Sequence, residues 1–195
     1  MTETPKSTNS VINSLVTSEE DNNRRKDTAT RDAIDAIQEL LFDPDASAKI
    51  FQLVLSFFIT ITKSEFGACY VSGQNAEFPI IPGAELTPLY DRDITEFVDA
   101  AVLASWVGQS SLLSSPIFYN YPLPDGPKKV LNPEIDFSSL MILPIITHNQ
   151  LRAICILANT QEDRSYKPEL LNKLKPLMGA IMCTLQSAES VRGNF

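Results

Sequence analysis

The sequence predicts an α+β domain in which a central antiparallel sheet of about five or six strands carries helices on both faces. The first indication is a pair of apolar, β-branched runs, Leu140–Ile146 and Leu151–Ala158, which the polar break Thr147–Gln150 separates as in a β-hairpin. The second is that neither run alternates between apolar and polar residues, which is typical of strands covered on both faces. The third is that segments with helical spacing of apolar residues precede and follow the hairpin, so the chain itself supplies the cover.

Length, charge and cysteine content limit the class of protein. A chain of 195 residues has room for one domain with tails. The formal net charge of −8 argues against a surface for nucleic acid or anionic lipid, so neither partner is expected. The three cysteines, Cys69, Cys155 and Cys183, are odd in number and widely spaced, which favours neither a disulfide framework nor a zinc site. A reducing, cytoplasmic location is therefore expected.

The polar N-terminus is expected to lie outside the folded domain. Residues 1–29 mix charges of both signs and contain too few apolar residues to offset the entropy of ordering. They lack the apolar core of a signal peptide, and the most apolar stretch of the chain, Ile50–Ile61, is well short of the ~20 residues that span a bilayer. We therefore expect a disordered tail at 1–29, a single domain at 30–190 and a short tail at 191–195, with no membrane anchor.

Two helices and a strand are predicted to open the domain. Apolar residues spaced by three and four follow Thr30, and this helix ends at Asp43–Asp45 because Pro44 disfavours helix at the residue before it. A second helix over Ala46–Thr62 has a wide apolar stripe, as expected for a helix packed flat on a sheet. Phe66–Ser72 then reads as a strand bounded by turn residues.

The middle of the chain is predicted to be less regular. Nearby prolines keep the strands at Phe78–Ile81 and Thr87–Leu89 short. Helical spacing predicts a helix over Asp93–Val107, with its first residue as the N-cap. The proline-rich segment Pro116–Pro133 is predicted to be an irregular loop that its tyrosines hold partly packed.

A terminal helix is predicted over Pro168–Ser187. Pro176 falls inside it and should kink or split it, because proline lacks a backbone donor and crowds the carbonyl four residues back. The apolar stripe of this helix is wider than one sheet contact needs, so part of it is expected to face another subunit.

Three short motifs follow one another in the last third of the chain: Leu-Pro-Ile at 143–145, Ile-Leu-Ala-Asn at 156–159, and Tyr166 ahead of Pro176. Together with the order of elements they resemble the second half of a GAF domain, a PAS-related fold, especially of the variety in bacterial sensor kinases and cyclase regulators. Asn120–Tyr121 and Pro124–Pro127 are similar to the proline- and glycine-rich loop that precedes this strand in the family. The resemblance covers roughly Asp32 to Ser187.

The chain departs from the family at positions tied to known ligands. Asn149 and Ala153 stand where the family often has glycine, and Pro127 replaces a common loop histidine. No Cys–His pair of the bilin-attaching kind is present, and the residues typical of cyclic-nucleotide-binding members are not recognisable. The resemblance therefore implies neither a tetrapyrrole nor a cyclic nucleotide, and the cofactor stays unknown.

Few residues offer catalytic chemistry. His148 is the only histidine and falls in the predicted hairpin turn, which excludes any site that needs two histidines. No catalytic residue and no metal ligand is predicted. One enzymatic version of the resembled fold, a reductase of free methionine sulfoxide, uses clustered cysteines. Cys69 and Cys155 would both lie on the sheet, so this activity is the less favoured alternative, although their positions do not match that motif.

The resemblance implies a non-catalytic sensory or regulatory module that binds a small molecule between the sheet, the Asp93–Val107 helix and the proline-rich loop. Trp106, Tyr119, Tyr121 and Phe137 are the predicted lining, with core packing the simpler role for Trp106. The terminal helices are expected to form a homodimer that passes a signal to a downstream protein. The alternative is a ligand-free dimerisation or protein-interaction module.

Overall fold

The computed structural model describes residues 31, 35, 47–73, 86–90, 97–109 and 115–192. Its helices are α2 (Ser47–Thr62), α3 (Ala100–Gln109), α4 (Asp125–Val130) and α5 (Pro168–Arg192), with a short 3-10 helix, η1 (Glu162–Arg164), before α5. Its strands are β1 (Phe66–Ser72), β2 (Leu86–Tyr90), β3 (Ile117–Asn120), β4 (Ser139–Thr147) and β5 (Gln150–Asn159). The predicted tail at 1–29, most of the helix after Thr30, the strand at Phe78–Ile81, the cap at Asp93 and residues 193–195 lie outside the described residues.

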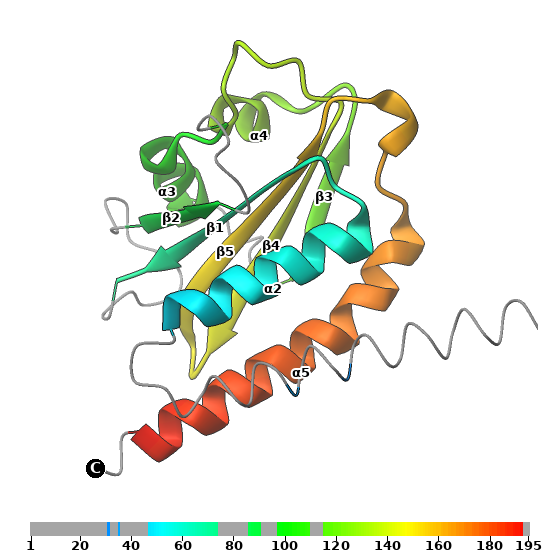
Figure 1. Cartoon of the computed structure of the whole chain (residues 1–195). Helices are drawn as coiled ribbons and strands as arrows, with labels where there is room; N and C mark the ends of the chain where they lie inside the picture. The colour runs from blue at the N-terminus through cyan, green and yellow to red at the C-terminus, as the bar shows by residue number, and fades with distance from the viewer. Residues whose placement is uncertain are drawn as a thin grey trace, which may run out of the picture.

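The five strands form one antiparallel sheet in the order β2-β1-β5-β4-β3, which Figure 1 shows from one side. The hairpin of β4 and β5 is confirmed, and almost every residue of its two strands is buried. His148 and Asn149 form its turn with φ angles of 48° and 59°. Positive φ at both central residues matches the right-handed twist of the strands that the turn connects.

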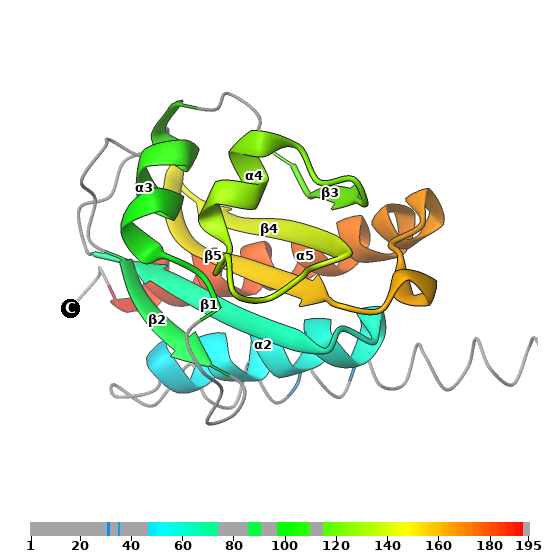
Figure 2. The same cartoon turned by 90° about the horizontal axis from the view of Figure 1, so that it is seen from above.

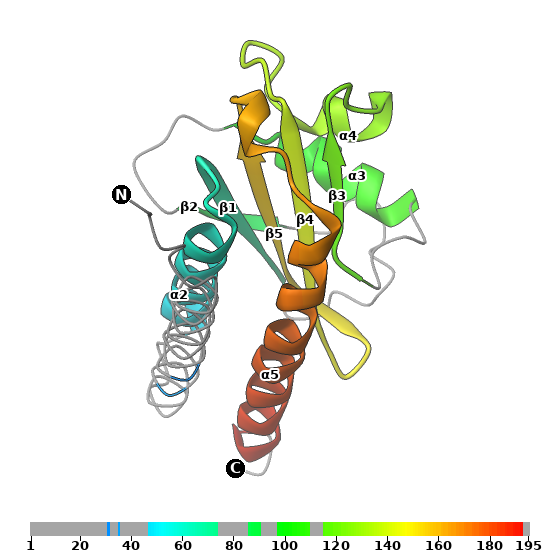
Figure 3. The ribbon, with the colours of Figure 1, turned by 90° about the vertical axis from the view of Figure 1, so that its right-hand side faces the viewer.

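Helices cover both faces of the sheet, as predicted. Alternating side chains of the strands divide the core into two clusters. The cluster beneath α2 and α5, here the α2/α5 face, contains Cys69, Met141, Leu143, Cys155 and Leu157 from the strands. The cluster beneath α3 and α4, here the α3/α4 face, contains Ala68, Tyr70, Leu140, Ile142 and Ile156. Figures 2 and 3 show these two helical layers on opposite sides of the sheet.

Helix α2 lies directly against β1 because Gly67 has no side chain. A Cβ atom at Gly67 would lie 2.7 Å from Cγ1 of Ile59 and 3.2 Å from Cδ1 of Leu55, both on α2. Real Cβ atoms do not approach other carbons as closely as the first of these distances. Glycine is therefore required for this depth of packing, and α2 seals the β1 side of the α2/α5 face.

The start of α3 differs from the prediction. Phe97 and Val98 have helical spacing in the sequence, but both precede the helix. Val98 instead forms an isolated antiparallel β-bridge with Leu131, the residue after α4. Asp99 caps the helix, since its Oδ1 accepts the backbone N–H groups of Ala101 and Val102 at 2.9 and 3.0 Å. A tertiary backbone pairing thus overrides the local helical pattern for the first residues.

The segment Pro116–Pro133, predicted as an irregular loop, contains both a strand and a short helix. The strand β3 pairs with β4 along its whole length, and α4 follows it. Proline is compatible with this arrangement because Pro116 and Pro122 flank an edge strand, where a missing donor interrupts no ladder. The prediction missed β3 because a four-residue edge strand carries too little pattern to recognise.

Helix α5 continues through Pro176 to Arg192, so the predicted split is wrong. Pro176 has no N–H, so the backbone carbonyl of Asn172, four residues earlier, lacks its helical hydrogen-bond donor. Both residues are exposed. Water can satisfy that carbonyl, which removes most of the cost of proline inside a helix. None of the described helices, α5 included, combines the length and apolar character needed to cross a bilayer.

Buried hydrogen bonds fasten the end of the sheet to the segment before α5. Asn159, which is 1 % exposed, accepts the backbone N–H of Glu65 at 2.9 Å and donates to the carbonyl of Arg164 at 3.0 Å. The side-chain amide of Asn120 and the backbone of Tyr166 exchange two hydrogen bonds of 2.9 Å. Asn159 and Tyr166, two of the motif residues, therefore have structural roles that tie β3 and β5 to the start of α5.

Glu65 adds a charged tie at the same end of the sheet. Its Oε2 accepts the backbone N–H and the hydroxyl of Thr160 at 2.7 and 2.8 Å, and its Oε1 lies 3.7 Å from Nη1 of Arg164. Burial by itself would raise the pKa of Glu65, but the hydrogen bonds from Thr160 and the charge of Arg164 outweigh burial. The pKa of Glu65 is therefore lower than its ordinary value of 4.5.

We expect Gly67→Ala to lower the free energy of unfolding by about 1–3 kcal/mol, because the added methyl group displaces Ile59 and Leu55. Urea unfolding monitored by circular dichroism measures the change. Gly179→Ala in α5 is the matched control, since nothing lies within 4 Å of its added Cβ and alanine favours helix. A Gly67→Ala protein as stable as the wild type would contradict the close seating of α2.

We expect Glu65→Gln to unfold at a lower temperature than the wild type at pH 7. The folded state lowers the pKa of Glu65, so its contribution is present above the unfolded pKa near 4.5 and is lost as the pH falls through the folded pKa. The difference in thermal midpoint should therefore shrink between pH 5 and more acidic buffers. Glu162→Gln, at an exposed acid of η1, removes the same charge and should unfold like the wild type. A deficit of Glu65→Gln that stays constant across this pH range would contradict the assignment.

Candidate functional site

The α3/α4 face is the candidate site, because most of the predicted lining residues gather there. Phe137 is 5 % exposed and belongs to this core cluster, while Trp106 and Tyr119 are half-buried and pack against it. Tyr121 is 67 % exposed and contributes nothing to the cluster. The structure therefore brings together three of the four residues and leaves Tyr121 in solvent.

Three phenylalanines fill the inner part of the α3/α4 face. The ring centroids of Phe66, Phe97 and Phe137 lie 5.5 to 5.9 Å apart, in tilted and edge-to-face arrangements that aromatic pairs prefer. Phe66 comes from β1, Phe97 precedes α3 and Phe137 precedes β4, so residues distant in sequence converge. The sequence indicated Phe137 alone, although the alternation of Phe66, Ala68 and Tyr70 along β1 would have assigned them to one face.

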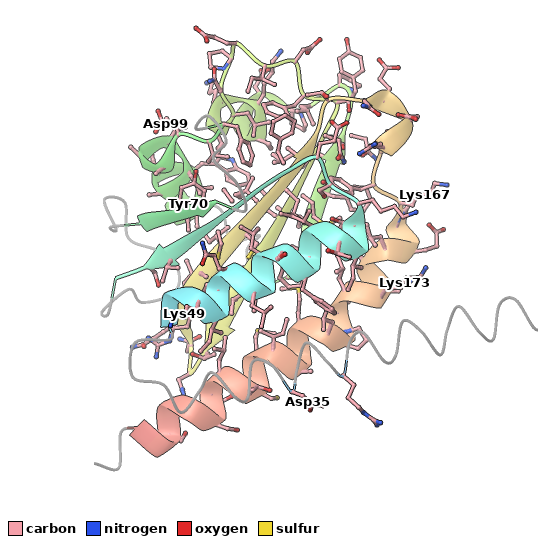
Figure 4. All side chains as sticks on the ribbon, viewed as in Figure 1. Asp35, Lys49, Tyr70, Asp99, Lys167 and Lys173 are labelled. Carbon is pink, nitrogen blue, oxygen red and sulfur yellow. The ribbon has the colours of Figure 1, made fainter. Side chains whose placement is uncertain are left out.

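Tyr70 closes the floor of the α3/α4 face. It is fully buried, and its hydroxyl donates to the carbonyl of Val98 at 3.2 Å. Figure 4 places Tyr70 and Asp99 on the side of the sheet that carries α3. Two backbone hydrogen bonds secure the same region. The N–H of Asp99 donates to the carbonyl of Val130 at 2.9 Å, and the N–H of Asn132 donates to the carbonyl of Phe97 at 2.8 Å. The start of α3 and the end of α4 are thus held together over the sheet.

Trp106 covers α4 at its glycine. A Cβ atom at Gly126 would lie 2.9 Å from Nε1 of Trp106 and 3.5 Å from its Cδ1, so the indole edge lies against the backbone of α4. In Figure 2, α4 lies between α3, which carries Trp106, and β3, which carries Tyr119. Trp106 and Tyr119 thus come from the two elements next to α4, and both are half-buried and pack against the filled core.

Tyr119 has an unusual environment for a tyrosine hydroxyl. Its side chain is half-buried, and burial raises the pKa of its hydroxyl above the ordinary value of 10.0. Within the described ranges, no hydrogen bond joins this hydroxyl to another residue. Buried and half-buried polar groups normally have a partner, so the hydroxyl is available to water or to a bound molecule.

The described residues of the α3/α4 face place no charged side chain in its interior. The buried polar residues among those described are serine, threonine and asparagine. None of them is Asp, Glu, Lys or Arg. A phosphate or carboxylate buried there would lack the charged partner that offsets its desolvation. No group of three or more His, Cys, Asp or Glu side chains able to hold a metal ion occurs in the described part of the chain.

None of the three cysteines lies on the α3/α4 face. Cys69 and Cys155 are buried on the opposite α2/α5 face, and Cys183 is exposed on α5. A hydrogen bond between the two buried thiols, with burial, raises the pKa of Cys155 well above its ordinary value. Catalytic cysteines need an accessible, readily ionised thiol, so this environment argues against the reductase alternative. The α3/α4 face also offers no thiol for a thioether link to a chromophore.

Comparisons with known proteins identify the fold. Neither the family models nor the curated proteins give a match to this sequence. Solved structures match over most of the chain. One is the GAF domain assigned to a sensor histidine kinase from Pseudomonas syringae pv. tomato, with a TM-score of 0.52 and 11 % identity over 88 % of this chain and 95 % of that one.

Two phytochrome structures have the same fold. A bacteriophytochrome from R. palustris matches with a TM-score of 0.57 and 10 % identity, over 87 % of this chain and 38 % of that one. The phycoerythrobilin-bound GAF domain of a cyanobacterial phytochrome matches with a TM-score of 0.52 and 8 % identity, over 84 % of this chain and 97 % of that one. At these identities the similarity is one of fold. The chain therefore has the GAF fold, the fold found in bacterial sensory and signalling proteins.

Proposed function

We propose that the chain is a non-catalytic, cytoplasmic sensory module that binds a small, uncharged, largely aromatic molecule at the margin of the α3/α4 face. The observation that carries this proposal is that Trp106, which lies against Gly126 of α4, and Tyr119 of β3 are both half-buried and pack against the core cluster of this face. Aromatic rings supply apolar contact area together with one polar group each, which suits a flat ligand. Charged ligands are disfavoured because the buried residues that the structure describes on this face include no counter-charge.

The inner and outer parts of the α3/α4 face have different roles in this proposal. Phe97, Phe137 and Tyr70 are buried and pack as permanent core, so they orient the layer without touching the ligand. Trp106 and Tyr119 contact the ligand, with the Tyr119 hydroxyl as its hydrogen-bond partner. Tyr121, predicted as lining, takes no part. A ligand of this kind would bias the contact between Trp106 and Gly126, and with it the position of α4.

The chain is further proposed to act as one domain over residues 30–190 and to signal as a homodimer through its helices to a downstream protein. Its support is that Leu53 and Phe57 of α2 and Leu171 and Met182 of α5 are only partly buried at the margin of the α2/α5 core. A second copy packed along these helices would cover them. Static light scattering at high concentration tests this, and a strictly monomeric mass would contradict it. A dimer that forms while no ligand stabilises the chain in a thermal-shift screen would favour the alternative, a ligand-free dimerisation or protein-interaction module.

Ligand binding should be visible through Trp106, because it is the only tryptophan. Screening uncharged aromatic metabolites by thermal shift should identify compounds that raise the midpoint by about 5–10 °C at a concentration ~100 times Kd. The same compounds should change the Trp106 emission. Gly126→Ala should weaken them by about tenfold or more, because its Cβ displaces the indole. Gly179→Ala is the control, and equal binding by Gly126→Ala would place the ligand elsewhere.

Tyr119→Phe separates binding from stability. Its hydroxyl has no hydrogen bond to the described residues, so we expect the free energy of unfolding to change by less than about 0.5 kcal/mol. Affinity for a ligand found in the screen should fall by about 2- to 12-fold, the equivalent of one hydrogen bond. Titration monitored by Trp106 fluorescence measures the loss. Unchanged affinity would show that the Tyr119 hydroxyl does not contact the ligand.

A further inference from the structure

Two buried thiols face each other on the α2/α5 face. Cys69 of β1 is the direct register partner of Cys155 of β5, and both residues are 0 % exposed. Both belong to the cluster beneath α2 and α5, so their side chains point to the same side of the sheet. Opposed residues of an antiparallel pair have Cα atoms about 4.5 or about 5.5 Å apart, and a disulfide spans about 4.4–6.8 Å. The strands therefore already hold the two cysteines at a separation that a disulfide requires.

The closed core protects this pair from oxidation. The thiolate is the form that reacts with peroxides and disulfides. Burial and the hydrogen bond between the two thiols keep Cys155 protonated, since both raise its pKa. Both cysteines are 0 % exposed, and Leu55 and Ile59 of α2 lie over Gly67, two residues before Cys69 on the same face of β1. Oxidation thus requires the helical layer to open.

We propose that Cys69 and Cys155 are a redox modification site, oxidised to an intramolecular disulfide by a peroxide when α2 or α5 lifts from the sheet. One of the two cysteines, as its thiolate, attacks a peroxide oxygen and becomes a sulfenic acid, and one water is released. The other thiol attacks that sulfur, forms the S–S bond and releases the second water. The two thiols together lose two electrons and two protons, and hydrogen peroxide is reduced to two waters.

The disulfide would have a mechanical consequence. It joins β1 to β5 and closes a chain segment that includes β2, α3, β3, α4 and β4. Closing so long a loop restricts the unfolded chain, so the oxidised protein should unfold at a higher temperature. Disulfide formation requires the helical layer to open, so its rate would increase with the frequency at which the α2/α5 face is uncovered. This inference does not depend on a ligand at the α3/α4 face.

The test uses the full chain with Cys183→Ser, which removes the exposed thiol. Hydrogen peroxide is added in native buffer and in urea below the unfolding transition, and remaining thiols are alkylated with N-ethylmaleimide before mass analysis. We expect both alkylation sites to be lost together and a Cys69–Cys155-linked peptide to appear, several-fold faster in urea. The thermal midpoint should rise and return to its original value after dithiothreitol.

Variants of α2 packing test the opening step. Gly67→Ala should accelerate formation of the linked peptide in native buffer, because it loosens α2, whereas Gly179→Ala should not. Cys69→Ala should abolish the rise in midpoint. The proposal is overturned if peroxide yields sulfinic acid at Cys155 without a linked peptide, or if both thiols remain alkylable in urea. An equal rate in native buffer and urea would likewise overturn the requirement for opening.

Discussion

Burial of the β4–β5 hairpin on both faces is the constraint on which the rest of the structure depends. Its strands occupy the interior of the sheet and expose almost no side chain, so each face needs its own helical layer. The chain meets this need with α2 and α5 on one face and α3 and α4 on the other. The hydrogen bonds of Asn159 and Asn120 then fix the edge at which β3 and the segment before α5 meet the hairpin.

The two faces differ in how tightly they are closed. On the α2/α5 face a long helix and a second helix seated on Gly67 cover a continuous apolar core that contains two thiols. On the α3/α4 face the cover is two shorter helices joined by a few backbone hydrogen bonds, and half-buried aromatic side chains lie at its margin. Ligand recognition is proposed for the α3/α4 face. Dimerisation and redox chemistry are proposed for the α2/α5 face. Short elements separate from a sheet at lower cost than long ones, so ligand binding is assigned to the α3/α4 face, whereas oxidation on the α2/α5 face requires the rarer opening of a long helix.

The GAF fold in this chain is conserved in shape at a sequence identity near 10 %. Solved structures with the same fold include a domain with a bound bilin, yet the described residues of the α3/α4 face here include no thiol and no buried charge. A shared architecture therefore sets where a molecule could bind, while the side chains on that face set which chemistry it could have. The lining proposed for this chain would select for apolar contacts and a single hydroxyl.

The sequence by itself determined the hairpin, β1, α2, α5 and the presence of helices on both faces. These elements have strong periodicity and long apolar runs, so local pattern and burial agree. Only the tertiary structure decided where α3 begins, that β3 is a strand and that α5 passes through Pro176, because each depends on a pairing or an exposure that neighbouring residues do not encode. The same holds for the candidate site. Phe137 and Trp106 were recognisable as aromatics near the sheet, but their separation into inner core and margin, and the exposure of Tyr121, followed from packing between distant segments.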